Sequence, residues 1–321
     1  MATEKKIIIP VLVLVIIIGA TRVIVWQQFY KPEKAITGLI TVVDDVGRNV
    51  TITNYPPKRI VSCAPSCTEI LFALGLGDKV VGVDKYSDYP LEVQDRVKAG
   101  NLTTVGAFAD ISLETVVGLQ PDLVIATGGV QRLVAEHLAG LGKPVVVLYP
   151  EKFYGVLTDI SLVGKVTGRI EEAEAIVADM QKRVQEIADK TRDVPRPRVY
   201  VEYSQMGGYW TFGGKSFADE LIYKAGGKNV FSGFEGKYMS TSSEEVLKAN
   251  PEIIIISKGA MSIATGLSPE AIKKRAGWDN IDAVQDNQIY EIEEDFISRE
   301  GPRIINGLEE FAKVIHPELF S

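Results

Sequence analysis

The clearest feature of the hydrophobic pattern is a unit that occurs twice: a short helical segment, a turn, and a buried strand. Residues 112–116 (SLETV) and 120–126 (QPDLVIA) form the first copy; residues 242–246 (SSEEV) and 250–256 (NPEIIII) form the second, 130 positions later. In each copy a proline and an acidic residue precede an apolar run, which is typical of a strand buried on both faces. The repeat indicates two similar halves.

Further segments match between the halves in the same order. They are residues 59–62 and 198–201 as entering strands, 69–75 (EILFALG) and 220–226 (ELIYKAG) as the helices that follow, and 144–148 and 288–292 as later strands. Strands that alternate with helices form parallel sheets covered on both faces. We therefore predict an α/β fold of two similar parallel-sheet, Rossmann-like lobes, at residues 39–152 and 195–321.

The segment between the lobes predicts one long helix. Residues 170–192 contain no Gly or Pro and are rich in Glu, Ala, Lys and Gln, and Pro195 follows as a stop. At 1.5 Å per residue such a helix is about 34 Å long. We expect residues 153–194 to be helical and to bridge the lobes, which restricts bending between them. Residues 40–43 and 50–52 predict a small hairpin that opens the first lobe.

The first 26 residues predict a membrane segment rather than part of the fold. Residues 7–26 are almost all apolar and follow Lys5 and Lys6, which suits either a cleaved signal peptide or an uncleaved signal anchor. The absence of a clear A-x-A cleavage site, and of a cysteine after the run that could carry a lipid, favours the anchor. Residues 27–38 are polar and predict a tether, so we expect the rest of the chain outside the cytoplasm.

Composition narrows the function classes. Of 321 residues, 46% are apolar and 24% charged, which is ordinary for a globular protein of about two domains. A net charge of −7 argues against nucleic-acid binding, which needs a basic face. With two histidines in the chain, catalysis built on a His pair is not expected.

Two facing α/β lobes create a cleft at the carboxyl ends of their strands, where such sheets bind ligands. The residues expected there are loop residues after strands. They are residues 62–68, 84–90, Phe108, residues 204–210, Tyr238 and residues 295–299. Aromatic side chains are frequent in this set, which suggests walls for a large and partly flat ligand, with Asp295 and Arg299 as polar anchors. The alternative is that most of these aromatics are ordinary core or rim residues.

Residues 66–69 (SCTE) have the pattern of a capping box, which predicts that Ser66 begins a helix and that Glu69 bonds back to it. Cys63 and Cys67 flank this segment. Buried free thiols or a short-loop disulfide are both favoured over metal ligation, so no metal site is predicted.

Glu114 and Glu244 occupy equivalent positions in the two copies of the repeat. Each falls in the first turn of its predicted helix, where a carboxylate stabilises the helix dipole, and that alone explains them. The repeat adds a second interpretation, because matched acids on two lobes could dock on a basic partner with two similar halves.

At these residues the chain resembles the class III substrate-binding proteins of ABC importers, which bind vitamin B12, haem and ferric siderophores. The resemblance covers about residues 40–320. It rests on the two repeats, residues 59–75 (RIVSCAPSCTEILFALG), 81–84 (VGVD) and 301–304 (GPRI). It implies two α/β lobes bridged by a long helix.

The resemblance also implies site residues. Residues 86–90 (YSDYP) look most like the vitamin B12 binders, whose matching tyrosine, here Tyr86, lines the corrinoid pocket. Phe108 and Tyr238 fall where those proteins carry pocket tryptophans, and Trp210 falls near a pocket phenylalanine. Asp295 and Arg299 match a polar pair that reaches the corrinoid. The cysteines at 63 and 67 depart from the family motif.

Glu114 and Glu244 fall on the two acids with which the family contacts permease arginines. The implied protein is a monomeric, membrane-tethered, extracytoplasmic receptor that delivers a cobalt corrinoid to an ABC permease. It has no catalytic residues and no cofactor of its own. A ferric siderophore or haem is the alternative ligand, and a two-lobed metallocluster or chelatase-type enzyme is the alternative class.

Overall fold

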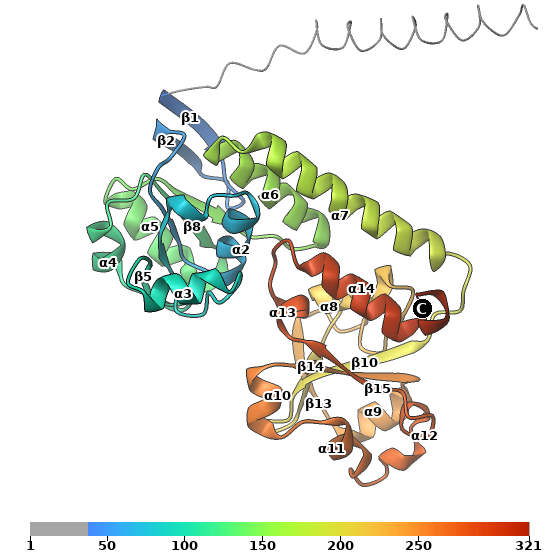
Figure 1. The fold of residues 1–321 in the computed structure, drawn as a ribbon. Coiled ribbons are helices and arrows are strands. Elements are labelled where there is room, and N and C mark those ends of the chain that lie inside the picture. Colours follow the sequence, from blue (N-terminus) through green and yellow to red (C-terminus); the bar gives the residue numbers. More distant parts are fainter. Residues whose placement is uncertain (1–37, 321) are drawn as a thin grey trace, which may run out of the picture.

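A computed structural model describes residues 38–320, which form two α/β lobes joined along one side by two helices (Figure 1). The predicted membrane segment (1–26), and all but the last residue of the predicted tether (27–38), lie outside the described residues. Within residues 38–320 no helix combines the length and the apolar character needed to cross a bilayer.

The N-terminal lobe is built on a five-stranded parallel sheet with strand order β5-β4-β3-β8-β9. Its strands are β3 (Ile60–Ser62), β4 (Val80–Val83), β5 (Thr103–Thr104), β8 (Leu123–Thr127) and β9 (Val145–Leu148). The helices around it are α2 (Pro65–Ala73), α3 (Glu92–Lys98), α4 (Leu113–Gly118) and α5 (Arg132–Gly140). Every residue of β3, β8 and β9 is buried, which explains their continuous apolar sequence.

The predicted hairpin is confirmed. β1 (Gly38–Val43) pairs antiparallel with β2 (Asn49–Tyr55). Alternate residues of β2, such as Val50 and Ile52, are buried against the lobe. A smaller antiparallel pair, β6 (Gly106–Ala107) with β7 (Asp110–Ile111), follows β5.

The C-terminal lobe has a mixed sheet, which differs from the all-parallel sheet that the sequence predicts. Its strands are β10 (Arg198–Ser204), β11 (Tyr209–Phe212), β12 (Lys228–Asn229), β13 (Tyr238–Thr241), β14 (Ile253–Lys258) and β15 (Ile289–Glu293). β10, β12, β14 and β15 are parallel to one another. β11 runs antiparallel to β10, and β13 runs antiparallel to β11. Residues 205–208 are too few for a crossover, so the chain turns back after β10 as a hairpin.

The helices of this lobe are α8 (Phe217–Lys224), α9 (Ser243–Ala249), α10 (Ala260–Thr265), α11 (Pro269–Lys273), α12 (Asp282–Gln285), α13 (Asp295–Ser298) and α14 (Ile304–Ile315). The sequence repeat is visible in the backbone: α4 leads into β8, and α9 leads into β14. Gln120 and Asn250 occupy the same place between helix and strand, and both adopt positive φ, 49° and 41°. These two left-handed residues turn the chain from each helix into the following strand.

The predicted inter-lobe helix is α7 (Ile170–Lys190), which packs along α6 (Phe153–Thr167) and spans both lobes (Figure 1). Met180 and Ile187 of its apolar stripe are buried, and Ile176 and Val184 are partly buried. All strands of the first sheet precede α6 and all strands of the second follow α7, so the chain passes between the lobes once.

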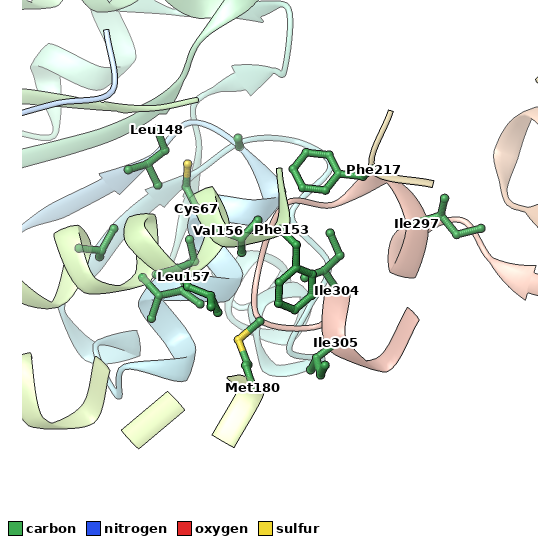
Figure 2. Close-up of a cluster of buried hydrophobic side chains, with 14 of the residues drawn as sticks. Cys67, Leu148, Phe153, Val156, Leu157, Met180, Phe217, Ile297, Ile304 and Ile305 are labelled. Carbon is green, nitrogen blue, oxygen red and sulfur yellow. The ribbon is translucent and has the colours of Figure 1, made fainter. Parts of the chain in front are cut away.

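The lobes share one apolar core rather than a hinge lined with water. Figure 2 shows Phe153 of α6 and Met180 of α7 next to Ile304 and Ile305 of α14. An ion pair adds to this contact, because Arg183 of α7 donates to Glu309 of α14 at 2.7 Å from both Nε and Nη2. Bending the lobes apart would expose this core, so the structure favours small relative motion.

Candidate functional site

A cavity of about 790 Å³ lies between the lobes and takes residues from both. Its lining residues follow strands: Tyr86 and Asp88 come after β4, Thr127 ends β8, and Glu294 comes after β15. The prediction of a cleft at the carboxyl ends of the strands is therefore confirmed. The volume lies within the range of sites for small organic ligands.

A second hollow of about 810 Å³ lies on the outer side of the N-terminal lobe. Its walls include Lys58, Lys79 and Asp122, which precede β3, β4 and β8. These residues mark the amino ends of the parallel strands, where α/β sheets do not bind their ligands. The inter-lobe cavity is therefore the stronger candidate site.

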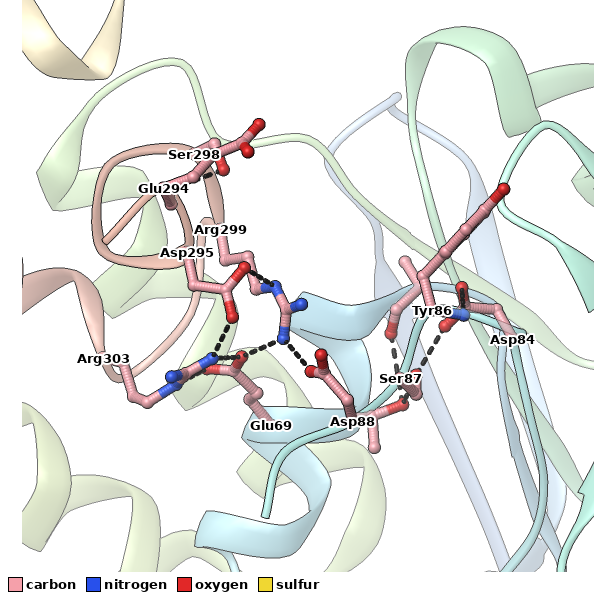
Figure 3. A network of polar contacts seen from close by, with 12 residues as sticks. Glu69, Asp84, Tyr86, Ser87, Asp88, Glu294, Asp295, Ser298, Arg299 and Arg303 are labelled. Atoms are coloured by element: carbon pink, nitrogen blue, oxygen red, sulfur yellow. Dashed lines mark hydrogen bonds and ion pairs between the residues drawn. The ribbon is translucent and has the colours of Figure 1, made fainter. Parts of the chain in front are cut away.

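The loop that carries Tyr86 is fixed from below by a chain of buried hydroxyl groups (Figure 3). The buried carboxylate of Asp84 accepts hydrogen bonds from the Ser87 hydroxyl and from the Tyr86 backbone N–H at 2.9 Å. Ser87 Oγ lies 2.7 Å from Thr68 Oγ1 on α2. Burial raises the pKa of Asp84, although the Ser87 and Tyr86 hydrogen bonds and the nearby Arg299 charge oppose it. Tyr86 itself is 53% exposed and lines the cavity, and the hydrogen bonds of its loop fix the backbone from which the ring projects.

Phe108 also lines the cavity, and its backbone is held by a residue that the sequence did not single out. The amide of Gln131 donates to the Phe108 carbonyl at 2.8 Å and to the Cys63 carbonyl at 2.6 Å. Gln131 is buried, and its own oxygen accepts from the Thr127 backbone at 2.9 Å. A lone glutamine before a helix gives no sequence signal for such a role.

Asp295 and Arg299 lie at the cavity floor on the C-terminal side, as predicted, and pair with each other at 2.9 Å. Arg299 also reaches across to the N-terminal lobe, donating to Glu69 at 3.2 Å and to Asp88 at 2.6 Å. Arg303, two residues after Gly301, forms two hydrogen bonds to Glu69 and one to Asp295. Figure 3 shows the two arginines meeting the three acids at the lobe interface.

The predicted capping box at residues 66–69 is wrong. Helix α2 begins at Pro65, its N-cap is Ala64, and no side chain caps it. Glu69 is buried and turned toward Arg299 and Arg303, because a carboxylate with cationic donors there is stabilised more than one exposed at a helix start. Arg303 stacks on the Tyr89 ring, 4.0 Å from its centroid.

Trp210 and Tyr238 do not line this cavity. They lie on β11 and β13, so Trp210 is on a strand and not in the loop that the sequence predicts. Both rings contact Tyr203 of β10, at centroid distances of 6.5 and 5.7 Å. Burial raises the pKa of the Tyr238 phenol, helped by Glu300 and Glu294, two residues that do line the cavity. The aromatic cluster therefore borders the C-terminal side of the site.

Cys63 and Cys67 are free thiols and both are buried, one of the two alternatives that the sequence leaves open. Burial raises the pKa of Cys63 to about 12, and burial also raises the pKa of Cys67 well above its ordinary value. Such thiols stay protonated and are poor metal ligands or nucleophiles. Among the residues that the structure describes, no cluster of His, Cys, Asp and Glu is arranged to hold a metal ion.

Glu114 and Glu244 are both exposed, each in the first turn of its helix, α4 or α9. Because each helix runs antiparallel to the strand after it, both helix starts lie at the carboxyl edge of their sheets. That is the edge that faces the cleft. The matched placement agrees with the repeat and leaves both carboxylates accessible to a partner.

Comparison with known proteins matches residues 60–296 to the family described as periplasmic binding protein. The uncharacterised ABC transporter substrate-binding lipoprotein YvrC of Bacillus subtilis is 31% identical over 288 residues, covering 88% of this chain and 87% of the relative.

Solved structures of other binding proteins have a similar fold. The periplasmic vitamin B12 binding protein BtuF of Vibrio cholerae is 28% identical with a TM-score of 0.69, covering 82% of this chain and 98% of that protein. The periplasmic heme-binding protein RhuT of Roseiflexus sp. RS-1 is 25% identical with a TM-score of 0.70, covering 81% and 98%.

Proposed function

The chain belongs to the periplasmic binding protein family, and from this premise we propose that its inter-lobe cavity captures a corrinoid for import. The broader function is established by the family: the chain is a substrate-binding protein of an ABC transporter, in the group that includes vitamin B12, haem and siderophore binders. It is therefore not an enzyme. Its partners are a small-molecule ligand and a permease, and it works outside the cytoplasm or at the membrane.

The observation that carries the corrinoid proposal is the composition of the cavity walls. Tyr86 and Phe108 give the N-terminal wall flat apolar surface, and Asp295 and Arg299 give the floor hydrogen-bonding groups. A corrin ring offers a broad face to the aromatics and peripheral amides to the polar groups. Tyr238 is 53% exposed beside the cavity, and we propose that it and Trp210 reach the ligand from the C-terminal side.

The Tyr86 loop is already held in place, so it does not need to fold when a ligand binds. The Tyr86 loop is held by Asp84, Ser87 and Thr68 before any ligand arrives. Binding then costs little ordering entropy at this wall, which favours affinity. Haem and ferric siderophores remain the alternatives, because a haem-binding protein shares this fold at 25% identity.

The test is a titration of the full-length protein with cyanocobalamin, haemin and a neutral ferric trihydroxamate, measured by fluorescence and calorimetry. Cyanocobalamin should bind most tightly, and Tyr86→Ala or Trp210→Ala should weaken it by about 1–3 kcal/mol, as for an aromatic anchor. Tyr154, an exposed tyrosine of α6 outside the cavity, provides the matched control Tyr154→Ala, which should change nothing. Tighter binding of haemin or hydroxamate by the folded wild-type protein would reject the corrinoid assignment.

We also propose that residues 1–26 hold the protein at the membrane and that Glu114 and Glu244 dock on basic residues of the permease. Their exposure, and their matched places on the two lobes, support the docking assignment. Membrane fractionation of the full chain, compared with a version that begins at residue 27, tests the anchor. Recovery of the full-length chain in the soluble fraction would contradict it.

A further inference from the structure

The charged residues of the inter-lobe cavity are unequal in number. Five acids and three basic residues line it. The acids are Asp88, Glu293, Glu294, Asp295 and Glu300, and the basic residues are Lys85, Lys258 and Arg299. Whether this excess acts on a ligand depends on which of the charges are already compensated within the protein.

Most of the basic charge is compensated. Arg299 donates to Glu69, Asp88 and Asp295, so three carboxylates share its guanidinium. Lys258 lies 3.4 Å from Glu291, a carboxylate outside the cavity lining. Lys85 is the lining cation without a carboxylate partner among the described residues, and its ammonium lies over the Tyr86 ring, 6.0 Å from the centroid.

Three of the lining acids have no salt-bridge partner among the described residues. Glu293, Glu294 and Glu300 form no ion pair within 4.0 Å in the part of the chain described. They are contributed by the end of β15 and by the residues around α13, so they form one side of the cavity, the C-terminal wall.

The position of Glu294 is fixed by its surroundings. Its carboxylate accepts a hydrogen bond from the Ala260 backbone N–H. It also packs so closely on Gly259 that a Cβ there would lie 1.6 Å from its Oε2. The hydrogen bond and the close contact with Gly259 hold the carboxylate at the cavity wall.

Holding Glu294 and Glu300 ionised in the cleft costs free energy in the absence of a ligand. Burial is the main cause that raises the pKa of Glu294 and of Glu300. The nearby Arg299 charge and the Ala260 hydrogen bond partly oppose it for Glu294, and the Lys237 charge partly opposes it for Glu300. A group in this position gains free energy when a bound molecule brings positive charge or N–H donors to it. An anionic molecule would instead meet carboxylates that have no salt-bridge partner, in a partly desolvated cleft.

We propose that Glu294 and Glu300 make the cavity selective for metal chelates with net positive charge, against neutral and especially anionic chelates of the same size. This rests on the proposed function, because it assigns the charge class of the ligand that the cavity captures. It disfavours haem, which carries two propionates, and ferric tricatecholates, which are trianions.

Matched ligand pairs test the selectivity. Diaquacobinamide, a dication, and dicyanocobinamide, which is neutral, share one corrin ring. A ferric trihydroxamate with a pendant ammonium group and its N-acetylated form make a second pair, in which the metal coordination is saturated. The full-length protein should bind the cation about tenfold more tightly within each pair it accepts, and 0.5 M salt should reduce this preference.

The double variant Glu294→Gln plus Glu300→Gln should bring the two affinities together, with the neutral ligand within about threefold of wild type. Glu270→Gln, at an exposed residue of α11 outside the cavity, is the control and should keep the preference. Circular dichroism and melting temperature verify folding of all three proteins.

The outcomes separate the two proposals. Failure of both cobinamides with a cation preference among the hydroxamates rejects the corrinoid function and keeps the charge selectivity. Equal affinity within both pairs, tighter binding of haemin than of any cation, an unchanged preference in the double variant, or binding of none of the four chelates overturns the selectivity.

Discussion

Glu69 of the N-terminal lobe and Arg303 of the C-terminal lobe are joined by two hydrogen bonds, of 2.9 and 2.6 Å, across the interface below the cavity. The Glu69 side chain is 1% exposed and the Arg303 side chain 14% exposed, so the pair is almost fully removed from water. Arg299 shares the same carboxylate.

Breaking this pair should destabilise the protein by about 3–5 kcal/mol, because Glu69→Gln leaves two buried guanidinium groups short of negative charge. Chemical denaturation at constant pH measures the free energy of unfolding. Glu136→Gln, at an exposed acid of α5, is the control. A loss below 1 kcal/mol would mean that Asp88 and Asp295 alone satisfy both arginines.

Asp159 of α6 gives the stability a pH dependence. Its carboxylate is buried and neither oxygen has a hydrogen-bond partner. Burial, with Asp45 and Glu300 nearby, raises the pKa of Asp159 to about 10. The folded chain thus keeps a proton that the unfolded chain releases above about pH 4, so this contribution to stability falls as the pH rises from about 4 to about 10.

Asp159→Asn removes that titration. The variant should be more stable than wild type by a few kcal/mol at pH 8, because wild type must take up a proton at Asp159 to fold and the variant need not, with the difference narrowing toward pH 4. Urea unfolding at several pH values measures it. Asp193→Asn, at an exposed acid, should give a flat difference. A pH-independent gap for Asp159→Asn would show that the carboxyl is not the titrating group.

Ligand should tighten the cleft by a small angle. α7 spans the lobes without a Gly or Pro, and Met180 lies in a core that continues into α14. Bending it would break i→i−4 hydrogen bonds and open that core. Small-angle scattering with and without ligand should show nearly the same radius of gyration. A large decrease would indicate a hinge-type closure instead.

Glu114 and Glu244 should matter to transport and not to capture. Each exposed contact is worth about 0–1 kcal/mol alone, but two linked contacts reinforce each other because the second forms at high effective concentration. Glu114→Ala plus Glu244→Ala should therefore reduce permease-dependent uptake, most visibly at higher salt, with ligand affinity unchanged. Loss of ligand affinity would place these acids in the pocket or in helix stability. Unchanged uptake would leave the helix dipole as their explanation.

Sequence patterns predicted the elements whose causes are local. The hairpin at Gly38–Val43 and Asn49–Tyr55 follows from alternation, and α7 follows from an uninterrupted run of helix formers. The repeat predicted the α4–β8 and α9–β14 pairs, because similar sequences form the same helix and the same buried strand in both lobes. Buried free cysteines were one of two open alternatives, since spacing does not determine which thiols meet.

The features that the sequence did not predict correctly depend on contacts between residues far apart in the chain. Glu69 fits a capping box by spacing, but its partner Arg303 lies 234 positions away and outcompetes the helix start. Trp210 ends the segment 204–210 that the sequence predicts as a loop, whereas in the structure Tyr209–Phe212 returns beside β10 and pairs with it. Gln131 holds Phe108 through backbone carbonyls, which no side-chain pattern records.

The single passage of the chain between the lobes has a consequence for how the protein is assembled. A cut in residues 191–197, just beyond α7, would leave two pieces with no covalent link, each containing one complete sheet. The first piece would still present α7, with Met180 and Arg183, to the α14 surface of the second. Complementary fragments ending at 194 and beginning at 195 have the contacts needed to reassociate. The contacts between α7 and α14 would then have to hold the two halves together without a covalent link.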